Sequence, residues 1–144
     1  MKPRAAISWS GGKDSYLALR RTRSTFDVGA MITMFHEDGA RSRSHGLRPE
    51  LVEAQAQRLD LTLCHGRGSW ATYEDGYRPA LREARTLGIT HVIFGDIMYE
   101  SNREFPERVI GVAAHDYVCH GGCWVVDLTV DDRATTQETN AARV

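Results

Sequence analysis

Residues 7–15 have the sequence Ile-Ser-Trp-Ser-Gly-Gly-Lys-Asp-Ser, and this stretch decides the fold. It starts within a short apolar run, residues 5–9, which predicts a buried strand, and a helical pattern follows over residues 15–22. The two glycines between them let the backbone approach an anion without a Cβ in the way. The first amides of the helix face that anion along the favourable end of the helix dipole. The stretch therefore predicts a phosphate-binding turn at the first strand–helix junction.

Polar side chains in the turn fit the same anion. Ser10 and Ser15 add hydroxyl groups, and Lys13 adds a point charge suited to phosphate. The turn is not a P-loop of the GxxxxGK[ST] type, because it is shorter and Lys13 directly follows Gly12. A tight turn with a simple helix cap is the competing interpretation, and the complete hexapeptide of residues 10–15 favours phosphate. The expected nucleotide-binding residues are Ser10, Gly11, Gly12, Lys13, Asp14, Ser15 and, after a later strand, Gly95.

Apolar runs alternate with helical patterns through most of the chain. The runs predict strands over residues 5–9, 28–35, 61–64 and 91–94, and the patterns predict helices over residues 15–22, 49–58 and 72–87. Each strand run is continuously apolar, which indicates a parallel sheet covered on both faces. The expected fold is α/β, a Rossmann-like parallel sheet flanked by helices. Ligands of such folds bind beyond the carboxyl ends of the strands.

Local signals refine this outline. Pro79 predicts a kink or a break within the third helix, and Gly88 is placed as the glycine that ends it. Residues 123–130 could form a further strand, whereas residues 131–144 are polar and predict a frayed tail. We therefore expect a nucleotide-binding domain over residues 1–110 and a divergent segment over residues 111–144.

Composition limits the class of protein. The 144 residues suffice for one domain, and the mean hydropathy of -0.40 is that of a globular chain. The 18 Lys and Arg against 19 Asp and Glu argue against nucleic acid as a partner. No apolar run is long enough to span a membrane. The three scattered cysteines and the absence of a signal-peptide pattern predict a cytoplasmic protein.

Carboxylates and a histidine stand where the strands end. Asp96 could hold Mg²⁺ or orient an acyl substrate, or it could cap the next helix; Asp14 leaves the same choice between metal and cap. His45 lies in a basic loop, where it could contact substrate or stabilise charge at the α-phosphate, with Arg41 and Arg43 gathered on a triphosphate. The competing interpretation is a solvated loop without fixed partners.

Aromatic and sulfur-containing residues offer weaker signals. Trp70 is a candidate for stacking on adenine, although packing in the core is the commoner use. Residues 115–123 contain two histidines and two cysteines, but their spacing lacks the paired pattern of structural zinc sites. Free thiols are therefore expected, and the roles of Cys119, His120 and Cys123 stay open.

Residues 10–15 match the SGGxDS signature of the PP-loop ATP pyrophosphatases, also known as adenine nucleotide alpha hydrolases. With lysine in the fourth position, the chain resembles the diphthine–ammonia ligase family in particular. Further similar stretches are residues 44–47 with the helix after them, residues 61–63, residues 92–97, Arg103 and residues 107–109. The resemblance covers residues 5–109.

The resemblance implies an ATP-dependent ligase. Members of the superfamily adenylate a carboxyl or carbonyl group, release pyrophosphate, and let a nitrogen or sulfur nucleophile displace AMP. It implies ATP and Mg²⁺ as cofactors, with Lys13, Asp96 and His45 as catalytic residues and with Asp96 and Asp14 at the metal. The partner would be an acyl substrate, protein-borne in this family, amidated by ammonia.

The chain departs from the family after Val109. Family members continue with a Gly-Leu segment, a Pro-Leu-Trp segment and a substrate-binding half, and residues from Ile110 onward do not follow that pattern. A non-catalytic or truncated nucleotide-binding module is therefore an alternative, and a second copy of the chain could supply missing walls of the site. Sulfur transfer to tRNA is a third hypothesis. It would need a reactive cysteine and a basic surface, and neither Cys64 nor the net charge supports it.

Overall fold

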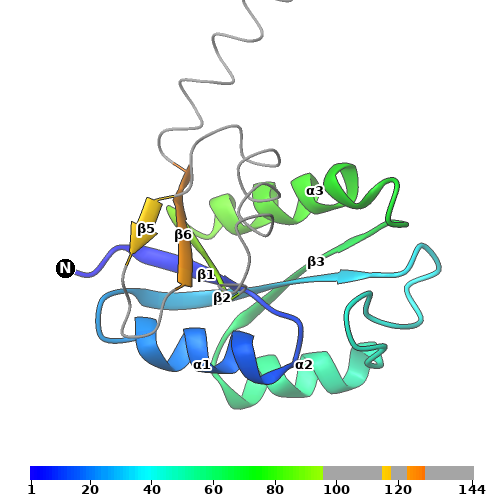
Figure 1. Ribbon diagram of the computed structural model, residues 1–144, viewed down its shortest axis with the longest axis horizontal. Coiled ribbons are helices and arrows are strands. Elements are labelled where there is room, and N and C mark those ends of the chain that lie inside the picture. The colour runs from blue at the N-terminus through cyan, green and yellow to red at the C-terminus, as the bar shows by residue number, and fades with distance from the viewer. Residues whose placement is uncertain (96–114, 118–122, 129–144) are drawn as a thin grey trace, which may run out of the picture.

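The computed structural model describes residues 1–95, 115–117 and 123–128 (Figure 1). These residues form a six-stranded sheet with the strand order β3-β2-β1-β4-β6-β5. The elements follow one another as β1 (Arg4–Ser8), α1 (Lys13–Thr22), β2 (Asp27–Phe35), α2 (Pro49–Arg58), β3 (Thr62–Arg67), α3 (Tyr73–Thr86), β4 (His91–Phe94), β5 (His115–Tyr117) and β6 (Cys123–Asp127).

The sheet is parallel over its first four strands. β1 pairs in parallel with β2 and with β4, and β2 pairs in parallel with β3. This arrangement confirms the α/β, Rossmann-like fold. β6 differs from the expected all-parallel sheet, because it runs antiparallel to β4 and to β5. Only five residues separate β5 from β6, whereas a parallel crossover needs about a dozen.

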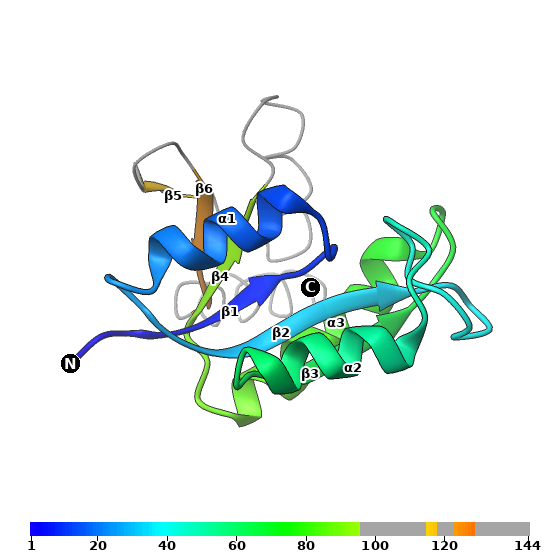
Figure 2. The same cartoon turned by 90° about the horizontal axis from the view of Figure 1, so that it is seen from below.

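Helices cover the two faces of the sheet. α1 and α2 lie on one face and α3 lies on the other (Figures 1 and 2). Successive residues of β1 point to opposite sides: Ala6 belongs to the core under α3, while Ala5 and Ile7 belong to the core under α1 and α2. Burial on both faces explains why the inner strands β1, β2 and β4 are largely apolar, whereas the edge strand β3 alternates buried and exposed residues.

Two local predictions concern α3, one at Pro79 and one at Gly88. The helix continues through Pro79 as one element from Tyr73 to Thr86, so Pro79 does not break it, and the kink stays a prediction. Proline fixes φ near the helical value, so the helix can continue, although Pro79 has no amide proton to donate to the preceding turn and its ring crowds the carbonyl there. Gly88 follows the helix with a φ of 81°, the left-handed conformation expected of the glycine that ends a helix.

Glycine also sets how α3 lies on the sheet. A Cβ added at Gly76 would overlap the carbonyl oxygen of Arg67 in β3, and one added at Gly66 would overlap the carbonyl oxygen of Gly76. Helix and strand therefore touch backbone to backbone, which brings the first turns of α3 close to the carboxyl end of β3. Among the described residues, no helix combines the length and apolar character needed to cross a membrane.

Candidate functional site

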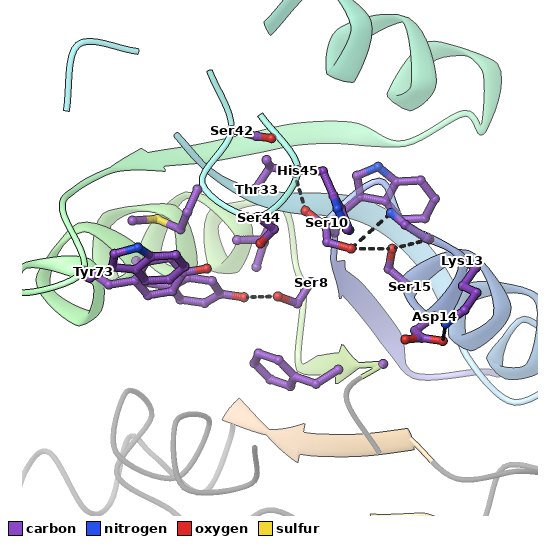
Figure 3. A pocket seen from close by; sticks show the side chains of 18 of the residues that line it. Ser8, Ser10, Lys13, Asp14, Ser15, Thr33, Ser42, Ser44, His45 and Tyr73 are labelled. Carbon is purple, nitrogen blue, oxygen red and sulfur yellow. Dashed lines mark hydrogen bonds and ion pairs between the residues drawn. The ribbon is translucent and has the colours of Figure 1, made fainter. Parts of the chain in front are cut away.

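A cavity of about 690 Å³ opens beyond the carboxyl ends of β1, β2 and β4 (Figure 3). Its size lies within the range of about 300–1,000 Å³ that is typical of small-molecule sites. Its lining comes from the phosphate turn, the ends of three strands, the β2–α2 loop, the β3–α3 connection and the start of α3. The residues are Ser8, Trp9, Ser10, Gly12, Lys13, Asp14, Ser15, Ile32, Thr33, Met34, Ser42, Ser44, His45, Trp70, Tyr73, Glu74, Tyr77, Phe94 and Gly95.

The phosphate turn is closed by its own hydrogen bonds. The Gly12 amide donates to Ser10 Oγ at 3.1 Å, and Ser15 Oγ donates to the Gly12 carbonyl at 3.1 Å. Gly12 is the N-cap of α1, and no side chain caps the helix there. The first-turn amides of a helix have no acceptor within it, so the start of α1 offers donors to an anion.

Lys13 and Asp14 form an exposed ion pair at this helix start. Lys13 Nζ lies 3.0 Å from Asp14 Oδ1, and the two side chains are 88% and 55% exposed. Asp14 does not cap the helix, so the capping alternative is excluded for it. An exposed pair contributes about 0–1 kcal/mol, and Lys13 can therefore exchange it for a phosphate at little cost.

Three glycines permit close approach around the turn. Gly11 has a φ of 84°, and a Cβ there would overlap Leu47. A Cβ on Gly12 would lie 2.6 Å from His45 Nε2, and one on Gly95 would lie 2.7 Å from the Asp14 carbonyl oxygen. Gly95 thus allows the end of β4 to meet the start of α1, and the imidazole of His45 covers Gly12.

The β2–α2 loop, residues 36–47, is anchored by hydrogen bonds. The Arg43 amide donates to the Met34 carbonyl at 2.9 Å, and the Ser42 amide donates to the Leu47 carbonyl at 2.8 Å. The Leu47 amide also donates to Ser42 Oγ at 2.9 Å. The alternative of a loop without fixed partners is therefore wrong, and these bonds hold His45 beside the phosphate turn.

The two loop arginines do not line the cavity. Arg43 lies with its Cζ 4.5 Å from the ring centre of Trp70, and its Nη1 is 2.9 Å from His36 Nδ1. Arg41 Nη1 donates to the Gly46 carbonyl at 3.2 Å. The predicted gathering of both arginines on a triphosphate is not what the structure shows; they fasten the loop instead.

Aromatic rings form the opposite wall of the cavity. Trp70 stacks on Tyr73 with 5.4 Å between ring centres, Tyr73 on Tyr77 with 6.2 Å, and Tyr77 on Phe94 with 6.4 Å. Trp70 is 66% exposed, so the expectation of core packing is wrong: it lies in the β3–α3 connection, beyond the buried face of the helix.

The sequence interpretation missed Ser8, Tyr73, Tyr77 and Phe94 as lining residues. Tyr73 and Tyr77 are four residues apart in a helical pattern, a spacing that places two side chains on one helix face. That signal was available, but nothing in it says that the face meets the phosphate turn. Tyr77 reaches Ser8 at the end of β1, and its hydroxyl donates to Ser8 Oγ at 2.8 Å.

Cysteine and metal chemistry find little support in the described residues. Burial, followed by the charge of Glu83, raises the pKa of the Cys64 thiol to about 11, which keeps it protonated and unreactive. Across residues 1–95, 115–117 and 123–128, no three His, Cys, Asp or Glu side chains cluster to hold a metal ion. The predicted residues Asp96, Arg103, Cys119 and His120 lie outside the described residues.

Comparison with known families adds one finding. A family model described as the diphthamide synthase N-terminal domain matches residues 3–113. Among curated proteins, none matches the chain.

Proposed function

Because the chain belongs to the diphthamide synthase N-terminal domain family, of the PP-loop ATP-binding type, we propose that it binds ATP and cleaves it between the α- and β-phosphates. The observation that carries the proposal is the uncapped start of α1, which faces a cavity of about 690 Å³ beside Lys13 and His45. A helix N-terminus with glycines and an exposed cation beside it is suited to a polyphosphate.

The residues present fit the phosphate groups in a specific way. We propose that the first-turn amides of α1 and the Lys13 ammonium bind the departing pyrophosphate, where they stabilise the charge that develops on it. The His45 ring covers Gly12, whose missing Cβ leaves space there. We propose that a phosphate oxygen binds in this space, with the ring either displaced or donating a hydrogen bond to that oxygen. Gly95 keeps the end of β4 close to Asp14, so that both sides of the cavity lie near the same phosphates.

Asp14 also bears on Mg²⁺. Its carboxylate lines the cavity, and carboxylate oxygens are the ligands that Mg²⁺ prefers, together with substrate phosphates and water. We propose Asp14 and Asp96 as its protein ligands. When bound, Mg²⁺ would neutralise part of the negative charge of the phosphates.

The motif resemblance supports an ATP-dependent amide ligase. In the proposed reaction a carboxylate oxygen of the acyl substrate bonds to the α-phosphorus, and the bond to the bridging oxygen breaks to release pyrophosphate. Ammonia then attacks the acyl carbon, AMP leaves with the electron pair of the broken C–O bond, and the nitrogen loses a proton. Positioning and electrostatics suffice for both steps, so no nucleophilic side chain is needed.

A nucleotide-binding module without catalysis is the second candidate. The matching family model describes an N-terminal domain only, which favours this alternative. We propose residues 1–110 as the nucleotide-binding unit, with residues 111–144 as a divergent segment that adds β5 and β6 to the sheet. The raised pKa of Cys64 speaks against sulfur transfer.

Two measurements on the full chain test the proposal. Calorimetric titration with ATP and Mg²⁺ should show binding, and pyrophosphate should appear when ATP, ammonia and carboxylate-bearing candidate substrates are incubated with the protein. Binding of ATP without pyrophosphate release from any candidate would support the module over the ligase. A chain that does not bind ATP would overturn both.

A further inference from the structure

The hydroxyl protons of the phosphate turn are used within the turn. Ser15 Oγ donates to the Gly12 carbonyl, so it can only accept from Ser10 Oγ, which lies 3.3 Å away. Ser10 Oγ accepts from the Gly12 amide and directs its own proton to Ser15. Thr33 Oγ1, on the cavity wall, donates its hydrogen bond to the Trp9 carbonyl at 3.0 Å.

Ser8 differs from these hydroxyl groups, because its hydroxyl accepts a hydrogen bond and keeps its own proton for a ligand. Its hydroxyl accepts a hydrogen bond of 2.8 Å from the Tyr77 hydroxyl, and within the described residues the Ser8 side chain makes no other hydrogen bond. Tyr77 is 1% exposed, and burial raises its pKa, so the phenol keeps its proton and remains the donor. Since a hydroxyl has one proton, that of Ser8 points away from Tyr77 and stays available to a ligand.

The position of Ser8 identifies what it can reach. It is the last residue of β1, on the α3 side of the sheet like Ala6, and it lines the cavity. Figure 3 shows its side chain between the phosphate turn, with Ser10 and Ser15, and the aromatic wall, with Tyr73. A nucleotide whose terminal phosphates lie at the start of α1 and whose nucleoside lies toward the aromatic wall would place its α-phosphate in this middle region.

We propose that Ser8 donates a hydrogen bond to an α-phosphate oxygen of ATP, and that Tyr77 is the positioning residue that orients the Ser8 hydroxyl. The inference rests on the proposed ATP binding and adds to it a residue at the reacting phosphorus. A donor whose orientation is restricted before the ligand arrives needs less reorganisation when charge on the α-phosphate oxygens changes during displacement. The serine is catalytic in this sense, and the tyrosine acts only through it.

The experiment compares ATP with pyrophosphate as calorimetric probes. Ser8→Ala should weaken ATP binding about 10-fold, as expected for one hydrogen bond to a charged group, and should leave pyrophosphate binding within about 2-fold. Tyr77→Phe keeps the serine but frees its rotation, so a smaller loss of about 3-fold is expected. Ser24→Ala, at the far end of α1, is the matched control and should change neither constant.

A second variant guards against misfolding. Ser8→Ala alone leaves the buried Tyr77 hydroxyl without this acceptor, which destabilises the fold. The double variant Ser8→Ala/Tyr77→Phe removes both partners, should fold, and should show the same 10-fold loss for ATP. A purely structural role of the pair would leave the ratio of the ATP and pyrophosphate constants unchanged.

The outcomes separate this inference from the proposed function. If the wild-type chain does not bind ATP, the proposed function fails. If it binds ATP and the double variant binds ATP equally well, only the role of Ser8 is overturned. Equal losses for ATP and pyrophosphate would overturn the α-phosphate assignment, whether they arise from a structural role of the pair or from contact of Ser8 with the terminal phosphates. Loss for ATP but not for 2′,3′-dideoxy-ATP would assign Ser8 to the ribose and also overturn it.

Discussion

The two ends of the cavity are built in different ways. The phosphate end comes from consecutive residues, 10–15, whose backbone and hydroxyls bond to one another. The aromatic end comes from the β3–α3 connection, from α3 and from β4, which meet only because the sheet places them together. A local turn can be read as a motif, whereas a wall assembled from separate elements depends on the packing of the whole domain.

The difference extends to what each end contributes. Lys13 and Asp14 are exposed, so changes there should alter ligand binding and leave stability almost intact. Tyr77 and the residues around it belong to the core under α3, so changes there should alter stability as well as the site. Each prediction below sets one end against the other.

The largest effect is expected where α3 touches β3. Gly76→Ala places a Cβ on the Arg67 carbonyl oxygen and should lower the free energy of unfolding by about 3 kcal/mol, as overpacking of a core does. Chemical denaturation measures it. Gly46→Ala is the control: its φ of 64° carries strain, but no atom lies near the added Cβ, so about 1 kcal/mol is expected. Equal losses would contradict the backbone contact.

High pH should destabilise the core under the aromatic end. The pKa of Cys64 rises from 9.0 to about 11 on folding, so the unfolded chain loses this proton first. The contribution of Cys64 is complete below pH 9 and is lost as the pH rises towards 11, by roughly 2–3 kcal/mol. Denaturation of the wild type and Cys64→Ala across this window measures it. If the two proteins lose stability in parallel across this window, the prediction is refuted. Because burial also raises the pKa of Tyr77, the stability of both proteins should decline further at high pH.

The phosphate end could be predicted from the sequence because its information is local. Two glycines, a lysine and two serines at a strand–helix junction specify backbone conformation and charge without reference to the rest of the chain. The parallel strands were likewise predictable, since burial on both faces leaves a continuous apolar run. The antiparallel β6 was not, because its pairing with β4 depends on how residues far apart in the chain meet.

The remaining walls could not be predicted for the same physical reason. Trp70 has the sequence environment of an ordinary aromatic residue, and only its place in a connection leaves it 66% exposed. Arg43 has the charge expected of a phosphate ligand, yet the ladder of bonds between its loop and β2 directs it to Trp70. Ser8 gains its orientation from Tyr77, 69 residues later in the chain.

A binding defect without loss of stability should follow from a change at the phosphate end. Lys13→Ala removes the cation at the helix start and should weaken ATP binding by roughly 10- to 30-fold, about 1.4–2 kcal/mol, with the unfolding midpoint unchanged. Calorimetric titration measures the affinity. Lys2→Ala is the matched control, because Lys2 bonds to the Arg23 carbonyl away from the cavity. If both variants bind ATP like the wild type, Lys13 is not a phosphate ligand.

The smallest effect concerns the contact that joins the two ends. Arg43 carries its guanidinium over Trp70, so this pair connects the loop that bears His45 to the aromatic wall. A double-mutant cycle of Arg43→Ala and Trp70→Ala should give a coupling energy of about 0.5–1 kcal/mol in unfolding, the value of a partly exposed cation–π pair. Arg41→Ala with Trp70→Ala serves as the control cycle and should give no coupling, because Arg41 bonds to the Gly46 carbonyl instead. Coupling near zero for Arg43 would mean that the loop is held by its backbone bonds to β2 alone, and that the two ends of the cavity are energetically independent.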